Sequence, residues 1–481
     1  MYIVLNVAAA LAASLLCLAW VPQAAGSGID QVMAYLNGIR GDQKFTRFPL
    51  FVVKVVGTIL SVSSSLAVGQ EGPLIHIGAI MGSGCTKIPG VTSMFLQKCQ
   101  EFFGNRCSCP TTRCECCCRN SPSSYYIRGP TVVQRIITWA TTELSYFATD
   151  AERRDLVSIG ASCGFAASFG APVGGLLFIL DDISSYFSKS LLLRILVANA
   201  VGTFCLAVEH NNLSNYSVIN LGTYTSSDSN IFVNRVEEIP LYIIVGVAGG
   251  ILGGLFTKTC MFIRRNVSRR YPPEGPKRLM YQLLEVAIVS VLTSVVIFYL
   301  PTFQWACKPR PEGYELDLQT YESALHSKTR FFCGEGQVNE LANILFGSRI
   351  DAIKRVLTNP TQFKLETLLG VGATFYVLMT LTFGIAIPSG IFTPTVLIGA
   401  SLGGAAGIIF QEKIDEQITP STFALLGVAA LLAGVQHSTV SVAVILVEGT
   451  GQIKVLTPAI ITVVVARYGK YCQHAVKSSD S

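Results

Sequence analysis

The sequence predicts an all-α, polytopic membrane protein with inverted repeats and with broken and re-entrant helices. Of the 481 residues, 50% are hydrophobic and only 14% are charged, whereas roughly 25% of a soluble domain is charged. Apolar segments recur along the whole chain, and several are shorter than the ~20 residues that a full crossing needs. Glycine- and proline-containing interruptions lie in corresponding positions of the two halves, which is typical of transporters with an ion site at the membrane midplane.

The apolar segments that we expect to enter the bilayer follow one another along a single domain, residues 1–481. They cover approximately residues 3–20, 50–68, 156–180, 190–207, 240–262, 280–301, 367–387, 393–410, 422–434, 438–447 and 455–467. The sequence has no alternating runs of barrel-strand length, so these segments are expected to be helices. Gly-Gly pairs such as Gly249-Gly250 and Gly403-Gly404 would let helix backbones approach each other closely.

A cysteine-rich polar stretch, residues 86–131, interrupts this pattern and is interpreted as an inserted loop. Its cysteine spacing does not match the paired Cys-x₂-Cys ligands of structural zinc, so we expect no metal site. Six of the 15 cysteines lie within residues 107–118 of this stretch, and disulfides in an extracytoplasmic loop and translated non-coding sequence are the two alternative explanations of this cluster.

Positive charge gathers in one short connection between apolar spans and predicts the orientation of the chain. The charges are those of Arg264, Arg265, Arg269, Arg270, Lys277 and Arg278. The positive-inside rule places this connection in the cytoplasm. The polar stretch 208–238 and the long loop 302–365, one span to either side, then face the lumen or the exterior. Because the basic patch is short and nearly free of aromatic residues, we do not expect nucleic acid as a partner.

Two kinds of modification are predicted for these luminal or exterior stretches. Asn212 and Asn215 each begin a glycosylation sequon. Cys307 and Cys333 are candidates for a disulfide. The sequon at Asn266 lies in the basic connection and is expected to stay unmodified.

Glu71 is the most informative residue, because it lies in Gly69-Gln70-Glu71-Gly72-Pro73 within an apolar stretch. Burial of an ionisable group in a membrane is unfavourable, so such a residue usually marks an ion or proton pathway. A lone intramembrane acid can also be a structural ion-pair partner, and we interpret Glu448 as a buried structural partner rather than a transport residue. At Glu71, the flanking Gly and Pro and the companion motifs favour a transport role.

Four glycine-containing breaks form the candidate site, numbered here in chain order. They are Gly26-Ser27-Gly28-Ile29-Asp30, Gly69-Gln70-Glu71-Gly72-Pro73, Phe169-Gly170-Ala171-Pro172-Val173-Gly174-Gly175 and Gly390-Ile391-Phe392-Thr393-Pro394. The third leads into a short helix that ends at Asp181-Asp182. Glycines before a helix expose unpaired N–H groups, and the helix dipole adds partial positive charge. Such helix N-termini bind an anion without a formal cation, weakly enough to release it.

These motifs resemble those of the CLC family of chloride channels and chloride/proton exchangers, in order and in approximate spacing. Asp155-Leu156-Val157-Ser158 and the run from Phe169 to Asp182 are similar to the endosomal–lysosomal branch. The resemblance covers the chain apart from roughly residues 86–140 and implies a homodimer in an endosomal or lysosomal bilayer, with one anion pathway per subunit. Chloride would be the bound substrate ion, no cofactor is implied, and an accessory membrane subunit is compatible with it.

The resemblance also implies a role for each motif residue. Ser27, next to Gly28, would donate its hydroxyl to chloride, and backbone amides at Gly390, Ile391 and Phe392 would complete the anion cradle. Glu71 would be the gating carboxylate, which competes with chloride and swings aside when protonated. Asp182 aligns with the family's inner proton-accepting glutamate and would exchange protons with Glu71. The supporting motif positions are Gly69, Gly72, Pro73 and Pro394.

The chain departs from the family pattern at several positions. Gln70 replaces the Lys or Arg usual before the gating glutamate, which removes positive potential. Asp30 replaces a proline, and its negative charge should weaken anion binding. Ungapped alignment puts Ser478 where the family has a tyrosine. Neither the family's first helix nor its C-terminal regulatory domains have a counterpart in this sequence.

Our leading hypothesis is therefore a chloride/proton exchanger gated by Glu71. Channels of the family carry an apolar residue at the position of Asp182, so a carboxylate there favours exchange. The alternatives are a passive voltage-gated chloride channel and a transport-inactive truncated subunit. The sequence has no evident nucleophile–base pair, so catalytic residues and an enzymatic activity are not expected.

Overall fold

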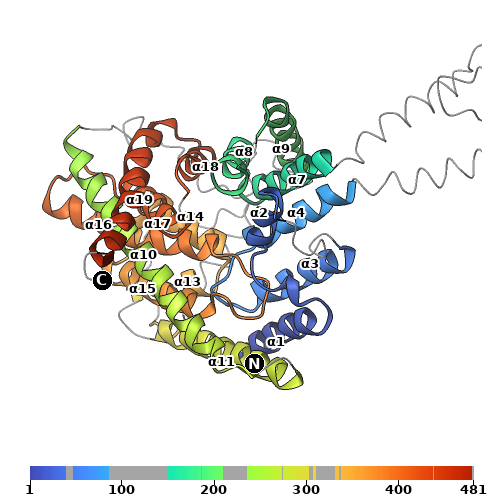
Figure 1. Ribbon diagram of the computed structural model, residues 1–481. Coiled ribbons are helices and arrows are strands. Elements are labelled where there is room, and N and C mark those ends of the chain that lie inside the picture. Colours follow the sequence, from blue (N-terminus) through green and yellow to red (C-terminus); the bar gives the residue numbers. More distant parts are fainter. Residues whose placement is uncertain are drawn as a thin grey trace, which may run out of the picture.

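The computed structural model describes most of the chain, and the fold of these residues is almost entirely helical (Figure 1). The described residues are 1–39, 47–85, 150–185, 187–209, 236–272, 275–302, 307–309, 331–334, 337–436 and 438–478. Within them, six helices are long and apolar enough to cross a membrane. The two short strands found there, β1 (Cys307–Pro309) and β2 (Gln337–Asn339), pair antiparallel. The predicted all-α membrane fold is confirmed.

The N-terminal half contains two kinds of helix, long spans and short segments that begin at the breaks. Its helices are α1 (Tyr2–Trp20), α2 (Ile29–Leu36), α3 (Phe48–Ser63), α4 (Glu71–Cys85), α7 (Asp150–Phe169), α8 (Pro172–Phe178) and α9 (Lys189–Glu209). A 3₁₀ turn, η1 (Pro22–Ala24), follows α1, and a π turn, η3 (Ile179–Ile183), continues α8. The single apolar run around Glu71 is thus divided between α3 and α4, because the backbone leaves the helical conformation between them.

The C-terminal half repeats this mixture. Its helices are α10 (Ile239–Ser268), α11 (Pro276–Tyr299), α13 (Glu340–Leu345), α14 (Arg349–Thr358), α15 (Leu365–Thr382), α16 (Phe392–Lys413), α17 (Pro420–Gln436), α18 (Val440–Thr450) and α19 (Leu456–Ser478). Short 3₁₀ turns are η4 (Val236–Glu238), η5 (Leu300–Thr302), η7 (Pro360–Gln362) and η8 (Ile453–Val455). Several of these helices have proline in their first turn, where its missing N–H leaves no helical bond unmade.

Glycine determines how closely the helices pack. A Cβ atom added at Gly78 of α4 would lie 2.1 Å from the carbonyl oxygen of Gly160 in α7. Likewise, a Cβ at Gly253 of α10 would lie 2.3 Å from the carbonyl carbon of Gly434 in α17. Such contacts leave no room for a side chain, so these helix pairs touch through their backbones.

The deepest part of the core is formed by α16 and α17. Residues 422–435 of α17 are all buried, and in Figure 1 this helix is surrounded by α10, α16 and α19. A helix that is apolar on every side needs partners on every side. Because α17 is enclosed by its neighbours, it is held in place, and the N-terminus of α16 packs against it.

The prediction of a long loop over residues 302–365 was wrong for its second half, which forms α13 and α14. The helix α14 buries Ala352, Ile353, Val356 and Leu357 on one face, at the spacing of an amphipathic helix. The prediction missed it because charged residues lower the average hydropathy of this stretch. In the same region Cys307 and Cys333 form a disulfide, with their Cα atoms 5.9 Å apart.

Other predictions fall on residues that the structure does not describe. The cysteine-rich stretch 86–131 lies outside the described residues, as do the sequon residues Asn212 and Asn215. Glycosylation and the inserted loop therefore stay predictions from the sequence.

Candidate anion site and gate

Three of the four breaks lie together at the centre of the fold. The N–H of Gly69 donates to the carbonyl of Gly390 (N···O 2.7 Å), and the N–H of Gly390 donates to the carbonyl of Gly69 (2.9 Å). The first break joins them, because the N–H of Gly26 donates to Ile387 (2.8 Å) and that of Ser389 donates to Gly26 (3.3 Å). Backbone hydrogen bonds thus tie the N-terminal half to the C-terminal half at the candidate site.

A helix begins at each of these three breaks. They are α2 at Ile29, α4 at Glu71 and α16 at Phe392. A Cβ added at Gly72 would lie 2.8 Å from the Cβ of Ser27, and one at Gly390 would lie 3.0 Å from the amide nitrogen of Gly72. The first turns of the three helices therefore converge, and their unpaired N–H groups and dipoles create positive potential suited to an anion.

The first break depends on a glycine with left-handed backbone. Gly28 has φ +80°, and a Cβ there would lie 2.0 Å from Nδ1 of His76, a buried residue of α4. The neighbouring Ser27 accepts a hydrogen bond from the N–H of Ile29 (3.3 Å). Gly28 is the N-cap residue of α2 and no side chain caps this helix; the bond to Ile29 uses a lone pair of the Ser27 hydroxyl, whose hydrogen is left for another acceptor.

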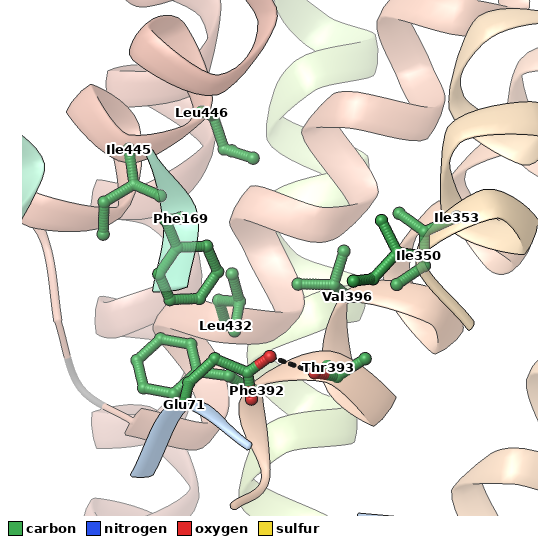
Figure 2. Close-up of a pocket in the computed structure, with 10 residues that line it drawn as sticks. All are labelled: Glu71, Phe169, Ile350, Ile353, Phe392, Thr393, Val396, Leu432, Ile445 and Leu446. Carbon is green, nitrogen blue, oxygen red and sulfur yellow. Dashed lines mark hydrogen bonds between the residues drawn. The ribbon is translucent and has the colours of Figure 1, made fainter. Parts of the chain in front are cut away.

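Glu71 is the first residue of α4 and is only 2% exposed. Thr393, in the first turn of α16, donates its hydroxyl to Oε1 of Glu71 (Figure 2). The other oxygen, Oε2, is buried without a hydrogen-bond partner among the described residues, and it lies over Gly69, where a Cβ would be 2.2 Å away. The carboxylate thus occupies a place at the N-terminus of α16 where an anion would be favourable.

The surroundings of the Glu71 carboxyl group are otherwise apolar. Glu71 lines a cavity of about 20 Å³, large enough for about one water, and Figure 2 shows the side chains around it. The other lining residues are Phe169, Ile350, Ile353, Phe392, Thr393, Val396, Leu432, Ile445 and Leu446. Water has little access to the carboxylate in this conformation.

A cluster of phenylalanine rings adjoins this cavity. The ring of Phe392 lies 5.4 Å from those of Phe165 and Phe169 and 5.8 Å from that of Phe178 (centroid distances). Phe178 lies one turn before Asp182, while Phe392 is next to the Thr393 that contacts Glu71. The cluster therefore lies between the segments that carry the two candidate proton-transfer acids.

Asp182 lies in the π turn η3 and is partly buried. Ser438, in the connection between α17 and α18, donates its hydroxyl to Oδ2 of Asp182. The adjacent Asp181 is exposed and accepts from the N–H groups of Thr439 (2.8 Å) and Val440 (3.2 Å). The two acids therefore have different roles: Asp181 caps α18, and Asp182 faces a hydroxyl that can exchange protons.

The helix N-terminus at the third break does not converge with those at the other three, although Phe169 of this break lies against Phe392. Glu448 of α18 accepts hydrogen bonds from the N–H of Val173 (3.0 Å) and of Gly174 (2.7 Å), in the first turn of α8. The N-terminus of α8 is thus occupied by a carboxylate of the protein itself. Glu448 therefore has a structural contact as the cap of α8, and the expectation that all four breaks contribute helix N-termini to one anion site is contradicted at α8.

Sequence reasoning missed a cation next to the site. Lys54 of α3 is fully buried and donates its ammonium group to the carbonyls of Ala24 (3.0 Å) and Gly26 (2.7 Å). The structure thus adds a basic side chain beside the first break, which we did not expect from the sequence. A single lysine in an otherwise apolar helix was the available signal, because an intramembrane charge usually has a function.

The remaining motif residues lie at the starts of the helices that follow the breaks. Pro73 and Pro394 fall in the first turns of α4 and α16, and both are buried. Ile391 is the N-cap residue of α16. Asp30 is exposed in the first turn of α2, where a negative charge is favourable for the helix.

Two larger cavities lie on either side of the gate. One, of about 670 Å³, includes Ala25 and Gly26 from the first break and Arg264 and Arg278 from the basic connection; we name it the inner cavity, because that connection is predicted to face the cytoplasm. The outer cavity, of about 260 Å³, includes Gly69, Gln70 and Thr393. The breaks thus lie between the two cavities, so an ion could reach the candidate site from either one.

Comparisons with known proteins agree with this arrangement. The chain is 30% identical to the human "H(+)/Cl(-) exchange transporter 7" over 477 residues, which are 96% of this chain and 51% of the relative. It is 31% identical to "Chloride channel protein CLC-b" of Arabidopsis thaliana over 468 residues, 96% of this chain and 53% of the relative. The chain spans about half the length of these curated relatives.

Solved structures share the fold. A cyanobacterial Cl⁻/H⁺ antiporter matches with a TM-score of 0.63 at 18% identity, over 98% of this chain and 83% of the other. A eukaryotic CLC transporter matches with a TM-score of 0.62 at 22% identity, over 98% of this chain and 63% of the other. The family profile described as "Voltage gated chloride channel" matches residues 9–105 and 129–469. Since this profile covers most of the chain and the central breaks coincide in space, the chain belongs to the voltage-gated chloride channel family, the CLC family.

Proposed function

We propose that this chain is the membrane domain of a chloride/proton exchanger. The observation that carries the proposal is the position of Glu71, whose carboxylate lies against the N-terminus of α16 where breaks from both halves meet. An anion and a carboxylate would compete for the same N–H groups there. Protonation removes the charge that holds Glu71 in place, so proton uptake and chloride binding are coupled.

The transport cycle follows from this competition. Chloride reaches Ser27 and the amides at Ile391 and Phe392 from the inner cavity, where Arg278 adds attractive potential and Arg264 is paired with Glu285 (2.7 Å). Glu71 then takes a proton and leaves the helix N-termini to chloride. Asp182 exchanges protons with the cytoplasmic side, and water that enters the phenylalanine cluster transiently connects the two acids.

The wider assembly is proposed on the same basis. Two of the relatives named above are an H⁺/Cl⁻ exchange transporter and a Cl⁻/H⁺ antiporter. We place the protein in an endosomal or lysosomal membrane as a homodimer, because its motifs resemble that branch of the family. An accessory membrane subunit is compatible with this assembly. The activity needs no cofactor, since the ion, the acids and the amides supply all of the chemistry.

The test is a simultaneous measurement of chloride and proton flux in liposomes that contain the full chain. An outward chloride gradient should drive protons inward against their own gradient. Chloride movement that drives no protons would favour the passive channel and overturn the exchanger. If neither ion moves, the transport proposal fails and the inactive-subunit alternative gains support.

A further inference from the structure

The outer cavity contains a charged group that the gate itself does not use. Arg349, the first residue of α14, lines this cavity together with Gln70 and Thr393. It is the one charged side chain among the described residues that line the cavity, and no carboxylate lies among them. The charge next to the gate on this side is therefore positive.

The guanidinium of Arg349 is held in place but is not neutralised. Nη2 donates to the carbonyl of Ser65 (2.6 Å), and Cζ lies 5.5 Å from the ring centroid of Phe375. Nη1 is buried and has no hydrogen-bond partner within the described residues, which also include no carboxylate paired with Arg349. A buried, unpaired cationic donor is unfavourable unless a ligand completes it.

The N-terminus of α14 adds to this potential. Gly347 and Ser348 line the cavity just before the helix, and the Ser348 side chain makes no capping bond. The first N–H groups of a helix lack helical partners and favour negative charge. Asp351, the acid in this turn, is not among the residues that line the cavity.

The opposite wall of the cavity adjoins the gate. Gly69 and Gln70 directly precede Glu71, and Thr393 donates to its carboxylate. The amide of Gln70 is a neutral donor, so a single formal charge faces the cavity. This combination suits a small monovalent anion better than a phosphate ester, which needs more cationic groups.

We propose that the outer cavity is an anion-binding site in which chloride is held between Arg349, the N-terminus of α14 and Gln70. This outer site rests on the proposed function and adds a second chloride-binding position on the outer side of the Glu71 gate. Gln70 stands where the family usually has Lys or Arg, and Arg349 supplies the missing positive potential from a different helix. Chloride leaving the central site would be held there until Glu71 returns to the helix N-termini.

The direct test uses bromide in place of chloride and locates it by anomalous diffraction from crystals of the full chain. We expect one bromide near Ser27 and a second beside Arg349. The second should disappear in Arg349→Gln and remain in Arg355→Gln, a matched loss of charge elsewhere on α14. Gln70→Glu is a second variant that leaves the contacts of Arg349 intact, and its added negative charge should also remove the outer bromide.

The flux measurement gives an independent result. In liposomes with fixed orientation, Arg349→Gln should raise the half-saturating chloride concentration on the outer side about tenfold, the change that 1.4 kcal/mol produces, and leave the inner value unchanged. Bromide beside Ser27 but not beside Arg349 overturns the outer site alone. Bromide at neither place overturns the proposed function as well. An outer bromide that persists in Arg349→Gln and Gln70→Glu also contradicts the inference.

Discussion

Lys54 and Glu71 are two buried ionisable side chains of opposite sign at the same group of breaks. Neither forms an ion pair within the described residues: Lys54 donates to carbonyls of the first break, and Glu71 accepts from Thr393. A buried charge without a counter-charge needs other polar groups to stabilise it. The carbonyls do so for Lys54, and the helix N-termini do so for Glu71, which leaves the site ready to exchange one anion for another.

Replacement of Lys54 tests its part in anion binding. In Lys54→Met, the carbonyls of Ala24 and Gly26 lose their donor and the first break loses a nearby positive charge. We expect chloride affinity to fall at least about tenfold, because a hydrogen bond to a charged group contributes about 1.5–3 kcal/mol and about 1.4 kcal/mol is a factor of ten. The measurement is the chloride dependence of flux, with Lys258→Met on the exposed side of α10 as the control. Equal affinities in the two variants would contradict the assignment.

Replacement of Asp182 tests the proton route. Asp182→Asn keeps the shape of the side chain and its contact with Ser438 but cannot become charged. We expect chloride flux to persist while coupled proton flux falls at least tenfold, since on the proposed route this acid supplies protons to Glu71 from the cytoplasmic side. Unchanged coupling in Asp182→Asn would show that protons take another route.

At the scale of elements, α8 and α18 cap each other. The carboxylate of Glu448, near the end of α18, accepts from the first turn of α8, and Asp181, just after α8, accepts from the start of α18. Each acid satisfies N–H groups that a helix leaves unpaired. The paired caps fix the position of the π turn between them and hence that of Asp182.

Glu448→Gln should therefore lower stability without removing the transport chemistry. A charged cap at a helix N-terminus contributes about 1 kcal/mol, so we expect an apparent Tm about 2 °C lower for the detergent-solubilised protein. The exposed Glu366→Gln in the first turn of α15 serves as the control. A Tm equal to that of the control would contradict the capping role.

The sequence predicts where helices break, but it does not predict which distant side chains meet at the breaks. The breaks at Glu71 and Phe392 were predictable, because glycine and proline interrupt apolar runs there. The hydrogen bonds of the Thr393 and Ser438 hydroxyls to the two acids were not predictable. Their partners come from distant segments, and no local sequence pattern indicates such a pairing. The third break was grouped with the others because its partner, Glu448, also comes from a distant segment. A glycine-rich helix start does not reveal whether its N–H groups will bind a free anion or a carboxylate of the protein.

At the scale of the whole molecule, the breaks lie between an inner and an outer cavity, and the basic connection lies on the inner side. Arg264 of that connection lines the inner cavity, while α14, from the stretch predicted to face the lumen or exterior, lines the outer one. The Cys307–Cys333 disulfide belongs to that same stretch. These features agree on one orientation of the chain in the membrane.

Glycosylation in cells tests this orientation. The sequons at Asn212 and Asn215 should be modified, and glycosidase treatment should increase the mobility of the protein on a gel. The double variant Asn212→Gln/Asn215→Gln should abolish the shift. The sequon at Asn266 in the basic connection is the internal control, and modification there would reverse the proposed topology.

The most direct measurement of the central claim is the simultaneous flux of chloride and protons through Glu71→Gln in liposomes, with Glu366→Gln as the matched control. A glutamine cannot carry a proton or compete as an anion for the N-terminus of α16. We expect chloride flux to continue in Glu71→Gln with no driven proton movement, while the control stays coupled. Proton transport that is retained in Glu71→Gln would contradict this expectation.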